Sequence, residues 1–202
     1  MNNKGFTIIE LMVVIAVISL LFFTASDLLI TVLFGSKQQF LAMTNVDQAV
    51  LVASKFTNDL RNATNGVDGS YPVYIADDNQ IIFFSNVGGV TNPIRVRYYL
   101  VDSTLYKGVI TPSGSPLAYN LSSEVISTVQ TDVVNGITPI FTYFDGDYSG
   151  VESALIQPVN VNNIKYIKMT LIILKKTQAD SDSTFSVTAG GVVRNLKTNL
   201  GN

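Results

Sequence analysis

A long and almost uncharged segment near the N-terminus dominates the pattern of apolar and polar positions. Between residues 6 and 26 the only charged side chain is Glu10. These residues would form roughly 31 Å of helix at about 1.5 Å each, which matches the hydrocarbon core of a bilayer. The pattern predicts one membrane-spanning helix. Lys4 precedes it, and positive charge marks the cytoplasmic side, so we expect the C-terminal bulk outside.

The next segment is amphipathic. After Gly35 and Ser36, which allow a kink, apolar residues recur at three- and four-residue spacing. This predicts one helix from Phe6 to about Arg61, with a stripe to bury on its second half. The stripe consists of Phe40, Met43, Val46, Ala49, Val50, Ala53, Phe56 and Leu60, while Gln48, Lys55, Asn58 and Asp59 are among the residues expected on the polar side.

From Tyr71 onward the pattern is that of β-strands. Alternating apolar residues predict strands at 73–76, 80–85, 94–100, 105–110, 140–144, 164–174, 185–189 and 192–194. Most connections allow antiparallel pairing, and the turn signals at 77–79 and 102–104 predict two hairpins. In the strand at 164–174, Ile167, Met169, Leu171 and Ile173 share one face. Residues 120–133 fit either a strand or a helix, and we favour a short helix or irregular segment. The chain is thus predicted to be α+β, with a spanning helix at 6–35, an amphipathic helix at 36–62 and a β-rich head at 66–202. We expect the helix to pack on one antiparallel sheet of this head.

Composition excludes most enzyme chemistry. The chain has no Cys, no His and no Trp, which removes thiol nucleophiles, zinc–thiolate sites, Ser-His-Asp catalysis and imidazole ligands. We therefore predict that the protein is not an enzyme. Residues 164–202 are basic, and Lys165, Lys168, Lys175, Lys176, Arg194 and Lys197 could form an edge for nucleic acid. We favour solvated lysines instead, and predict no nucleic-acid partner.

The start of the chain, Lys4-Gly5-Phe6-Thr7-Ile8-Ile9-Glu10, resembles the processing signal of type IV prepilins and type II secretion pseudopilins. The resemblance implies a pilin-like fold and a leader of residues 1–5, cut between Gly5 and Phe6 by prepilin peptidase. It also implies N-methylation of Phe6. Glu10 would then pair with the Phe6 amine of a neighbouring subunit in a filament of pilins or pseudopilins.

Three other interpretations of this segment stay open. The small residues Thr24-Ala25-Ser26 suit a signal peptidase, so the segment could be an ordinary secretory signal. It could also be a plain single-span anchor in which Glu10 has no role. The third alternative is a buried core helix, which the lack of a polar face between Leu11 and Phe23 disfavours.

The head is similar to that of minor subunits, in particular the J-type pseudopilin and the W-type minor pilin. The similarity rests on Arg97-Tyr98-Tyr99-Leu100, on Phe141-Thr142-Tyr143-Phe144-Asp145 and on the strand from Ile164. It implies a minor subunit of a type IV pilus or a secretion pseudopilus. The expected location is the cytoplasmic (inner) membrane, with a single span, and then the filament.

One stretch of the head could hold a metal. Asp145, Asp147 and Ser149 place oxygens at alternate positions, and Gly150 is the sixth residue, as in a calcium loop. The twelfth position is Ile156 rather than Glu, and a hairpin turn has the same composition. Calcium is the only cofactor that the sequence suggests. The alternative function is accordingly a membrane-anchored extracellular binding module whose head holds calcium or a surface ligand.

Overall fold

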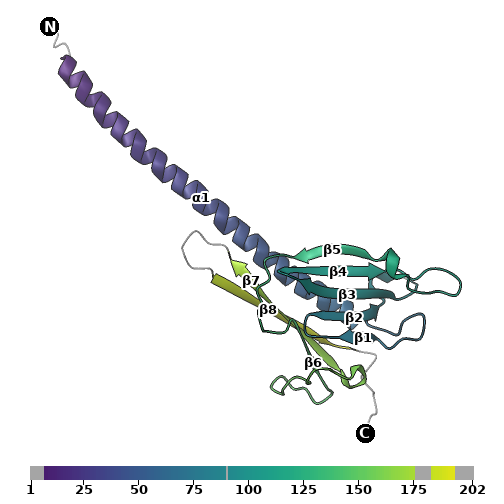
Figure 1. Ribbon diagram of the computed structural model, residues 1–202. Coiled ribbons are helices and arrows are strands. Elements are labelled where there is room, and N and C mark those ends of the chain that lie inside the picture. The colour runs from purple at the N-terminus through teal and green to yellow at the C-terminus, as the bar shows by residue number, and fades with distance from the viewer. Residues whose placement is uncertain (1–6, 90, 176–182, 194–202) are drawn as a thin grey trace.

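The computed structural model describes residues 7–89, 91–175 and 183–193, without the side chains of 37–42 and 44. Helix α1 (Ile8–Arg61) has 54 residues and passes through Gly35 without interruption, as a gently curved rod (Figure 1). It begins two residues later than predicted, because Thr7 is extended and caps the helix. Its end at Arg61 confirms the predicted stop.

Five strands form an antiparallel sheet in chain order. They are β1 (Val73–Ala76), β2 (Gln80–Ser85), β3 (Ile94–Val101), β4 (Thr104–Ile110) and β5 (Val125–Gln130). The predicted hairpins β1–β2 and β3–β4 are both present. The described loops of the head contain the short 3₁₀ helices η1 (Val87–Gly89), η2 (Leu121–Ser123) and η3 (Val161–Asn163).

The remaining strands form a second sheet, so the expectation of one sheet is corrected to two. This sheet has the order β6 (Phe141–Phe144), β7 (Tyr166–Lys175) and β8 (Ser183–Val192), all antiparallel. Strand β8 contains the segment expected at 185–189 and reaches only the first residue of the one expected at 192–194, because Val193 is not in a strand and Arg194 lies outside the described residues. Strand β8 continues through Gly190 and Gly191, where neighbouring groups come close to the backbone. A Cβ at Gly190 would collide with the Tyr166 side chain, and α1 lies against Gly191.

The prediction of a short helix or irregular segment at residues 120–133 is wrong for Val125–Gln130. Only Leu121–Ser123 is helical, as a single 3₁₀ turn, and Val125–Gln130 is strand β5. The local sequence fits both structures. Pairing with the edge of β4 favours the strand over a helix. It gives backbone partners in β4 to Val125, Ile126, Ser127 and Thr128, whereas an isolated helix would lack such tertiary support.

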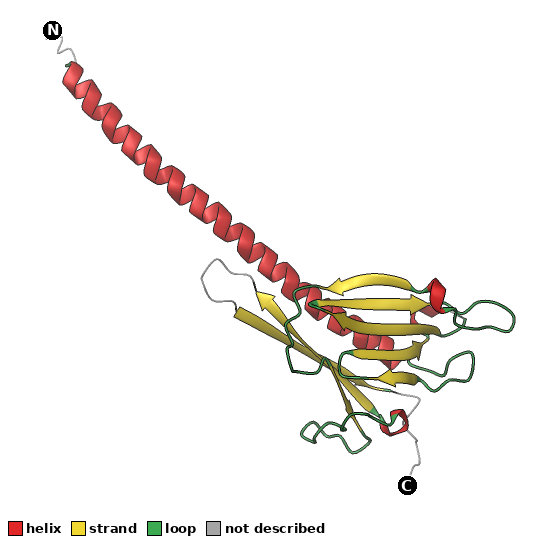
Figure 2. Ribbon diagram, in the orientation of Figure 1, coloured by secondary structure: helices red, strands yellow, loops and turns green. Residues whose placement is uncertain are grey.

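The second half of α1 lies between the two sheets (Figure 2). Phe56 is fully buried, with its ring 6.2 Å from Phe83 and 5.4 Å from Tyr98 in the five-stranded sheet. On the other side it is 5.6 Å from the ring of Phe141 in the three-stranded sheet. The predicted inward face of β7 is confirmed, since Ile167, Met169, Leu171 and Ile173 are all fully buried. One core therefore joins the helix to both sheets.

The predicted apolar stripe of α1 is buried only in part. Ala49, Ala53, Phe56 and Leu60 are in the core as expected. Met43 and Val50 are not, with 67% and 50% of their surface exposed. The head covers one side of the helix and leaves a second apolar line uncovered.

Candidate functional site

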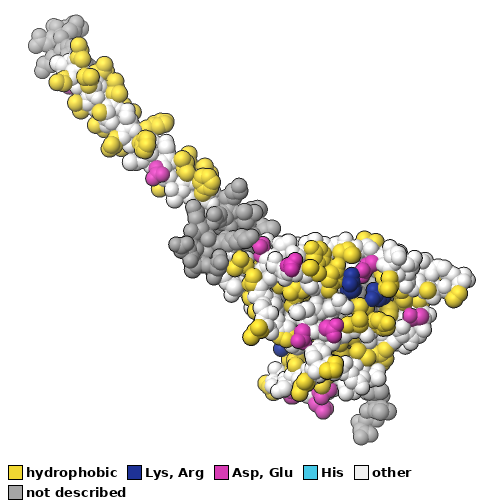
Figure 3. Space-filling model, viewed as in Figure 1, with side chains coloured by type: hydrophobic (Ala, Val, Ile, Leu, Met, Phe, Trp, Pro, Cys, Tyr) yellow, Lys and Arg dark blue, Asp and Glu magenta, His cyan; other side chains and the backbone are white. Residues whose placement is uncertain are grey.

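The N-terminal half of α1 is apolar on all sides, and nothing in the described part of the chain covers it. Residues Ile8–Ser36 are long and apolar enough to cross a membrane, and none of that segment is buried. Its large apolar side chains are between 46% and 82% exposed, and Figure 3 shows such side chains along the visible face of the rod. The hypothesis of a buried core helix is therefore wrong. An apolar helix of this kind needs lipid or other helices around it.

Glu10 lies in the first turn of this helix. Thr7 caps the turn, because the Glu10 backbone N–H donates to Thr7 Oγ1 at 3.3 Å. The Thr-x-x-Glu spacing is that of a capping box, and a carboxylate at this end also favours the helix dipole. Gly5 and Phe6 lie outside the described residues. A contact between the Phe6 amine and Glu10 stays a prediction.

Two serine and two threonine hydroxyl groups of the span donate hydrogen bonds within the helix. Ser19 donates to the Ile15 carbonyl at 2.7 Å, and Ser26 donates to that of Phe22 at 2.8 Å. Thr24 and Thr31 donate in the same way to carbonyls one turn back. In a membrane these groups need no outside partner. Within Ile8–Ser36 this leaves Glu10 and Asp27 as the charged side chains.

Comparison with known proteins addresses this same segment. Residues 1–26 match the family model described as the prokaryotic N-terminal methylation motif. The chain carries the N-terminal signal of the type IV pilin and pseudopilin family. The motif, the uncovered helix and the antiparallel sheets agree with a pilin-like α+β fold. Comparison with curated proteins finds none that matches the chain.

The signal has direct consequences for this prepilin-type chain. It implies cleavage by a prepilin peptidase, methylation, anchoring in a membrane and assembly with other pilins. The match favours a prepilin-type signal over a secretory signal or a plain anchor. The family is structural rather than catalytic.

A buried ion pair joins the helix of the pilin-like fold to its head. Asp59, which is 4% exposed, accepts a hydrogen bond from Tyr98 Oη at 2.8 Å and from Lys107 Nζ at 2.5 Å. Its backbone carbonyl accepts from Ser85 Oγ at 2.6 Å. Burial, together with the Asp59 charge, raises the pKa of Tyr98 far above its ordinary value. Three strands of one sheet are thus tied to the last turns of α1.

The helical periodicity placed Asp59 on the solvent side, and that prediction is wrong. The missed signal is in β4, where Leu105, Lys107 and Val109 alternate on the inner face. A lysine at an inward position needs a carboxylate nearby. Asp59 supplies it, and this pair could have been sought from the sequence of β4.

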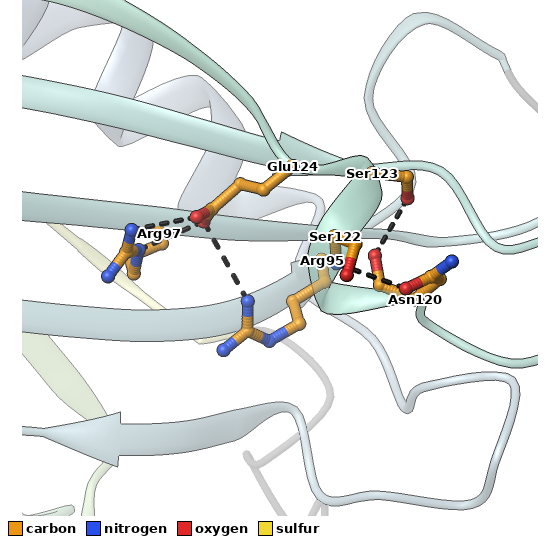
Figure 4. A network of polar contacts seen from close by, with 6 residues as sticks. All are labelled: Arg95, Arg97, Asn120, Ser122, Ser123 and Glu124. Atoms are coloured by element: carbon orange, nitrogen blue, oxygen red, sulfur yellow. Dashed lines mark hydrogen bonds and ion pairs between the residues drawn. The ribbon is translucent and has the colours of Figure 1, made fainter.

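A second charged group lies on the outer face of the five-stranded sheet (Figure 4). Arg97 binds Glu124 through two hydrogen bonds, of 2.9 and 2.7 Å, and Arg95 Nη1 lies 3.9 Å from the same carboxylate. Gly108 makes room for Glu124, because a Cβ there would collide with its carboxylate. Burial lowers the pKa of Arg95, and Glu124 opposes that shift. The group fastens the start of β5 across β3 and β4.

In the candidate calcium loop, the Glu152 carboxylate accepts hydrogen bonds from other residues of the same loop. Ser149 Oγ donates to Glu152 at 2.6 Å, and the backbone N–H groups of residues 149–151 point at the same carboxylate. These bonds, with that of the Ser149 hydroxyl first, lower the pKa of Glu152 to about 2. Asp145 accepts from the Asp147 N–H. Among the described residues no group of three or more His, Cys, Asp or Glu could hold a metal, and calcium at Asp145, Asp147 and Ser149 stays a prediction.

The basic edge is only partly visible. Lys176, Arg194 and Lys197 lie outside the described residues. Lys168 and Lys175 lie over the rings of Phe144 and Phe185, each at 5.1 Å. These contacts agree with lysines on the outer face of strands, and the prediction that no nucleic acid binds stays untested.

Proposed function

We propose that this chain is a minor subunit of a type IV pilus or a type II secretion pseudopilus. Prepilin peptidase cuts it between Gly5 and Phe6, and the new Phe6 amine is methylated. The C-terminal head lies outside the cytoplasmic membrane. The subunit then leaves the membrane when α1 exchanges lipid for the helices of its neighbours. The observation that carries the proposal is the uncovered apolar helix, the first part of which lies within the matched methylation motif.

Glu10 guides this docking by pairing with the Phe6 amine of a neighbouring subunit. The charge on Glu10 is exposed in the isolated chain and has no partner among the described residues. Two opposite unit charges 4 Å apart attract by about 4 kcal/mol at an effective dielectric constant near 20. Desolvation cancels part of this energy, and what remains favours one axial register over others.

The minor status rests on the head. Its two sheets enclose α1 in one core, and its strands carry the elements that resemble the J-type pseudopilin and the W-type minor pilin. A minor subunit is present in few copies and contributes specific contacts rather than bulk. The number of copies per filament, counted by quantitative mass spectrometry, tests this part of the proposal.

The first experiment is mass spectrometry of the N-terminus in cells with and without prepilin peptidase. We expect loss of residues 1–5 and a methylated Phe6 only when the peptidase is present. An intact Met1 in both strains, or a start near Asp27, would overturn the proposal.

Glu10 variants test the docking step separately. Glu10→Gln keeps the shape and removes the charge, while Glu10→Asp keeps the charge and serves as the control. We expect both variants to be cut. The Gln variant should be at least about tenfold depleted from the filament fraction, which corresponds to about 1.4 kcal/mol. Equal recovery of the two variants would contradict the role of the charge.

A further inference from the structure

Other parts of the head contact the border strands β1, β6 and β8. At β1 the Ala76 carbonyl accepts from Gln157 Nε2 at 3.1 Å, and at β6 the Tyr143 carbonyl accepts from the Leu155 N–H at 2.8 Å. The last residues of β8 pack against α1, where Gly191 faces Leu60. Such cover is how proteins prevent a border strand from pairing with other chains.

Strand β5 is different. It is the last strand of the five-stranded sheet, and Figure 1 shows it along an open border. Its residues 125–128 contain no charge and no proline. Val125 is 72% exposed and Ile126 is 51% exposed. Short, uncharged segments rich in β-branched residues are those that pair most readily with another strand.

The protection of β5 is confined to one end. Tyr106 pairs with Thr128 and Leu105 pairs with Gln130, so Val129 is the extra residue of a β-bulge. The Val129 carbonyl accepts from Gln48 Nε2 of α1 at 2.8 Å. Within the described part of the chain, nothing comparable binds the outer backbone of residues 125–128.

A cavity of about 240 Å³ lies beside this edge, between β5 and α1. Ser127, Leu51 and Lys55 are among the residues that line it, and Lys107 lies there with its charge already taken by Asp59. Leu51 is 52% exposed. Lys55 has no carboxylate within ion-pair distance among the described residues. The cavity therefore suits an extended chain with an apolar side chain for Leu51 and a carboxylate for Lys55.

We propose that β5 and the facing turns of α1 form a strand-addition site for an extended segment of a neighbouring subunit in the same filament. This inference rests on the proposed function. The occupant follows from the position of this site on α1, because Met43, Val50 and Leu51 are exposed apolar residues of the same helix, and Leu51 also lines the cavity beside β5. A neighbour that packs along α1 reaches the open edge, where backbone hydrogen bonds bind it.

Hydrogen–deuterium exchange of the full chain tests this site. One sample is the uncut subunit, extracted in detergent from cells without prepilin peptidase, and the other is the assembled filament. Added backbone bonds should slow exchange at alternate amides of residues 125–128 by at least about tenfold in the filament. Exchange in β7, which is central in its sheet, serves as the internal reference.

A matched pair of variants separates this edge from the surface in general. Val125→Lys places a charge on the free edge, and Val151→Lys makes the same change at a loop residue that is 90% exposed. Both positions are exposed, so neither change should unfold the head. We expect Val125→Lys to abolish the slowed exchange and to lower recovery in the filament, while Val151→Lys behaves as the unchanged chain.

Each other outcome overturns the proposal in a distinguishable way. If the chain is cut and found in filaments without slowed exchange at β5, or with slowing at β8 alone, the strand-addition site is wrong and the subunit role stands. If mass spectrometry finds the chain uncut and outside the filament, both proposals are wrong.

Discussion

Replacing Asp59 and replacing Lys107 should destabilise the protein by different amounts. The Asp59 side chain is 6% exposed and that of Lys107 is 21% exposed. Lys107→Met leaves a buried carboxylate with only the Tyr98 hydroxyl as side-chain donor. Removing one member of a buried pair costs about 3–5 kcal/mol, and we expect about 3 kcal/mol here.

The reverse change should cost less. In Asp59→Asn the Lys107 ammonium can turn towards the solvent that already reaches it, and the new amide oxygen can still accept from Tyr98. We expect a loss of about 1–1.5 kcal/mol in the free energy of unfolding. The double variant should cost less than the sum of the single variants, because it leaves no unpaired charge.

The measurement is denaturant unfolding of the full chain in detergent, followed by near-ultraviolet circular dichroism. Tyrosine dominates this signal, since the chain has no Trp and nine Tyr. Lys55→Met is the control, because Lys55 is exposed and unpaired among the described residues, and it should change stability by no more than about 0.5 kcal/mol. Equal costs for the two single variants, or a larger cost for Asp59→Asn, would refute the assignment of the buried charge.

Three further changes test other parts of the head. Because the pKa of Glu152 is lowered, the hydrogen bonds of its carboxylate stabilise the loop fully above the ordinary pKa of 4.5, and this contribution is lost as the pH falls through about 2. The variant Ser149→Ala should shift the pKa of Glu152 back towards 4.5, as measured by NMR titration of the carboxyl group. Gly190→Ala brings a methyl against the Ile167 backbone and should cost about 2 kcal/mol, whereas Gly146→Ala, with only a 3.7 Å contact, should be nearly neutral in thermal unfolding. Phe56→Ala removes the ring that contacts both sheets and should cost about 3–5 kcal/mol in the same assay.

The parts of the fold that local pattern determines could be predicted from the sequence. The span, the helix end at Arg61 and both early hairpins follow from hydropathy, stop signals and alternation. The split into two sheets could not be predicted, because nothing local tells Phe141 to pair with Met169 and not with the first sheet. The same limit applies to β5, whose structure depends on the edge of β4.

The candidate site divides in the same way. Glu10 is recognisable because a carboxylate in an apolar helix violates a simple rule of burial. Asp59 is not, because its neighbours in sequence make it look like a residue of the polar face, and only Lys107 from a distant strand explains its burial. For Val50 the prediction fails in the opposite direction, because its periodic position predicted a buried side chain and the head leaves it exposed.

The unbroken length of α1 sets how far the head can move before assembly. Its 54 residues make a lever of roughly 80 Å. A tilt of about 20° at the membrane, which is ordinary for a single span, would carry the far end sideways by nearly 30 Å, or about the width of a small domain. A hinge at Gly35 would uncouple the head from the tilt of the span, whereas a continuous helix transmits that tilt to the head. A subunit held by one span can thus sample a wide area of membrane surface without diffusing.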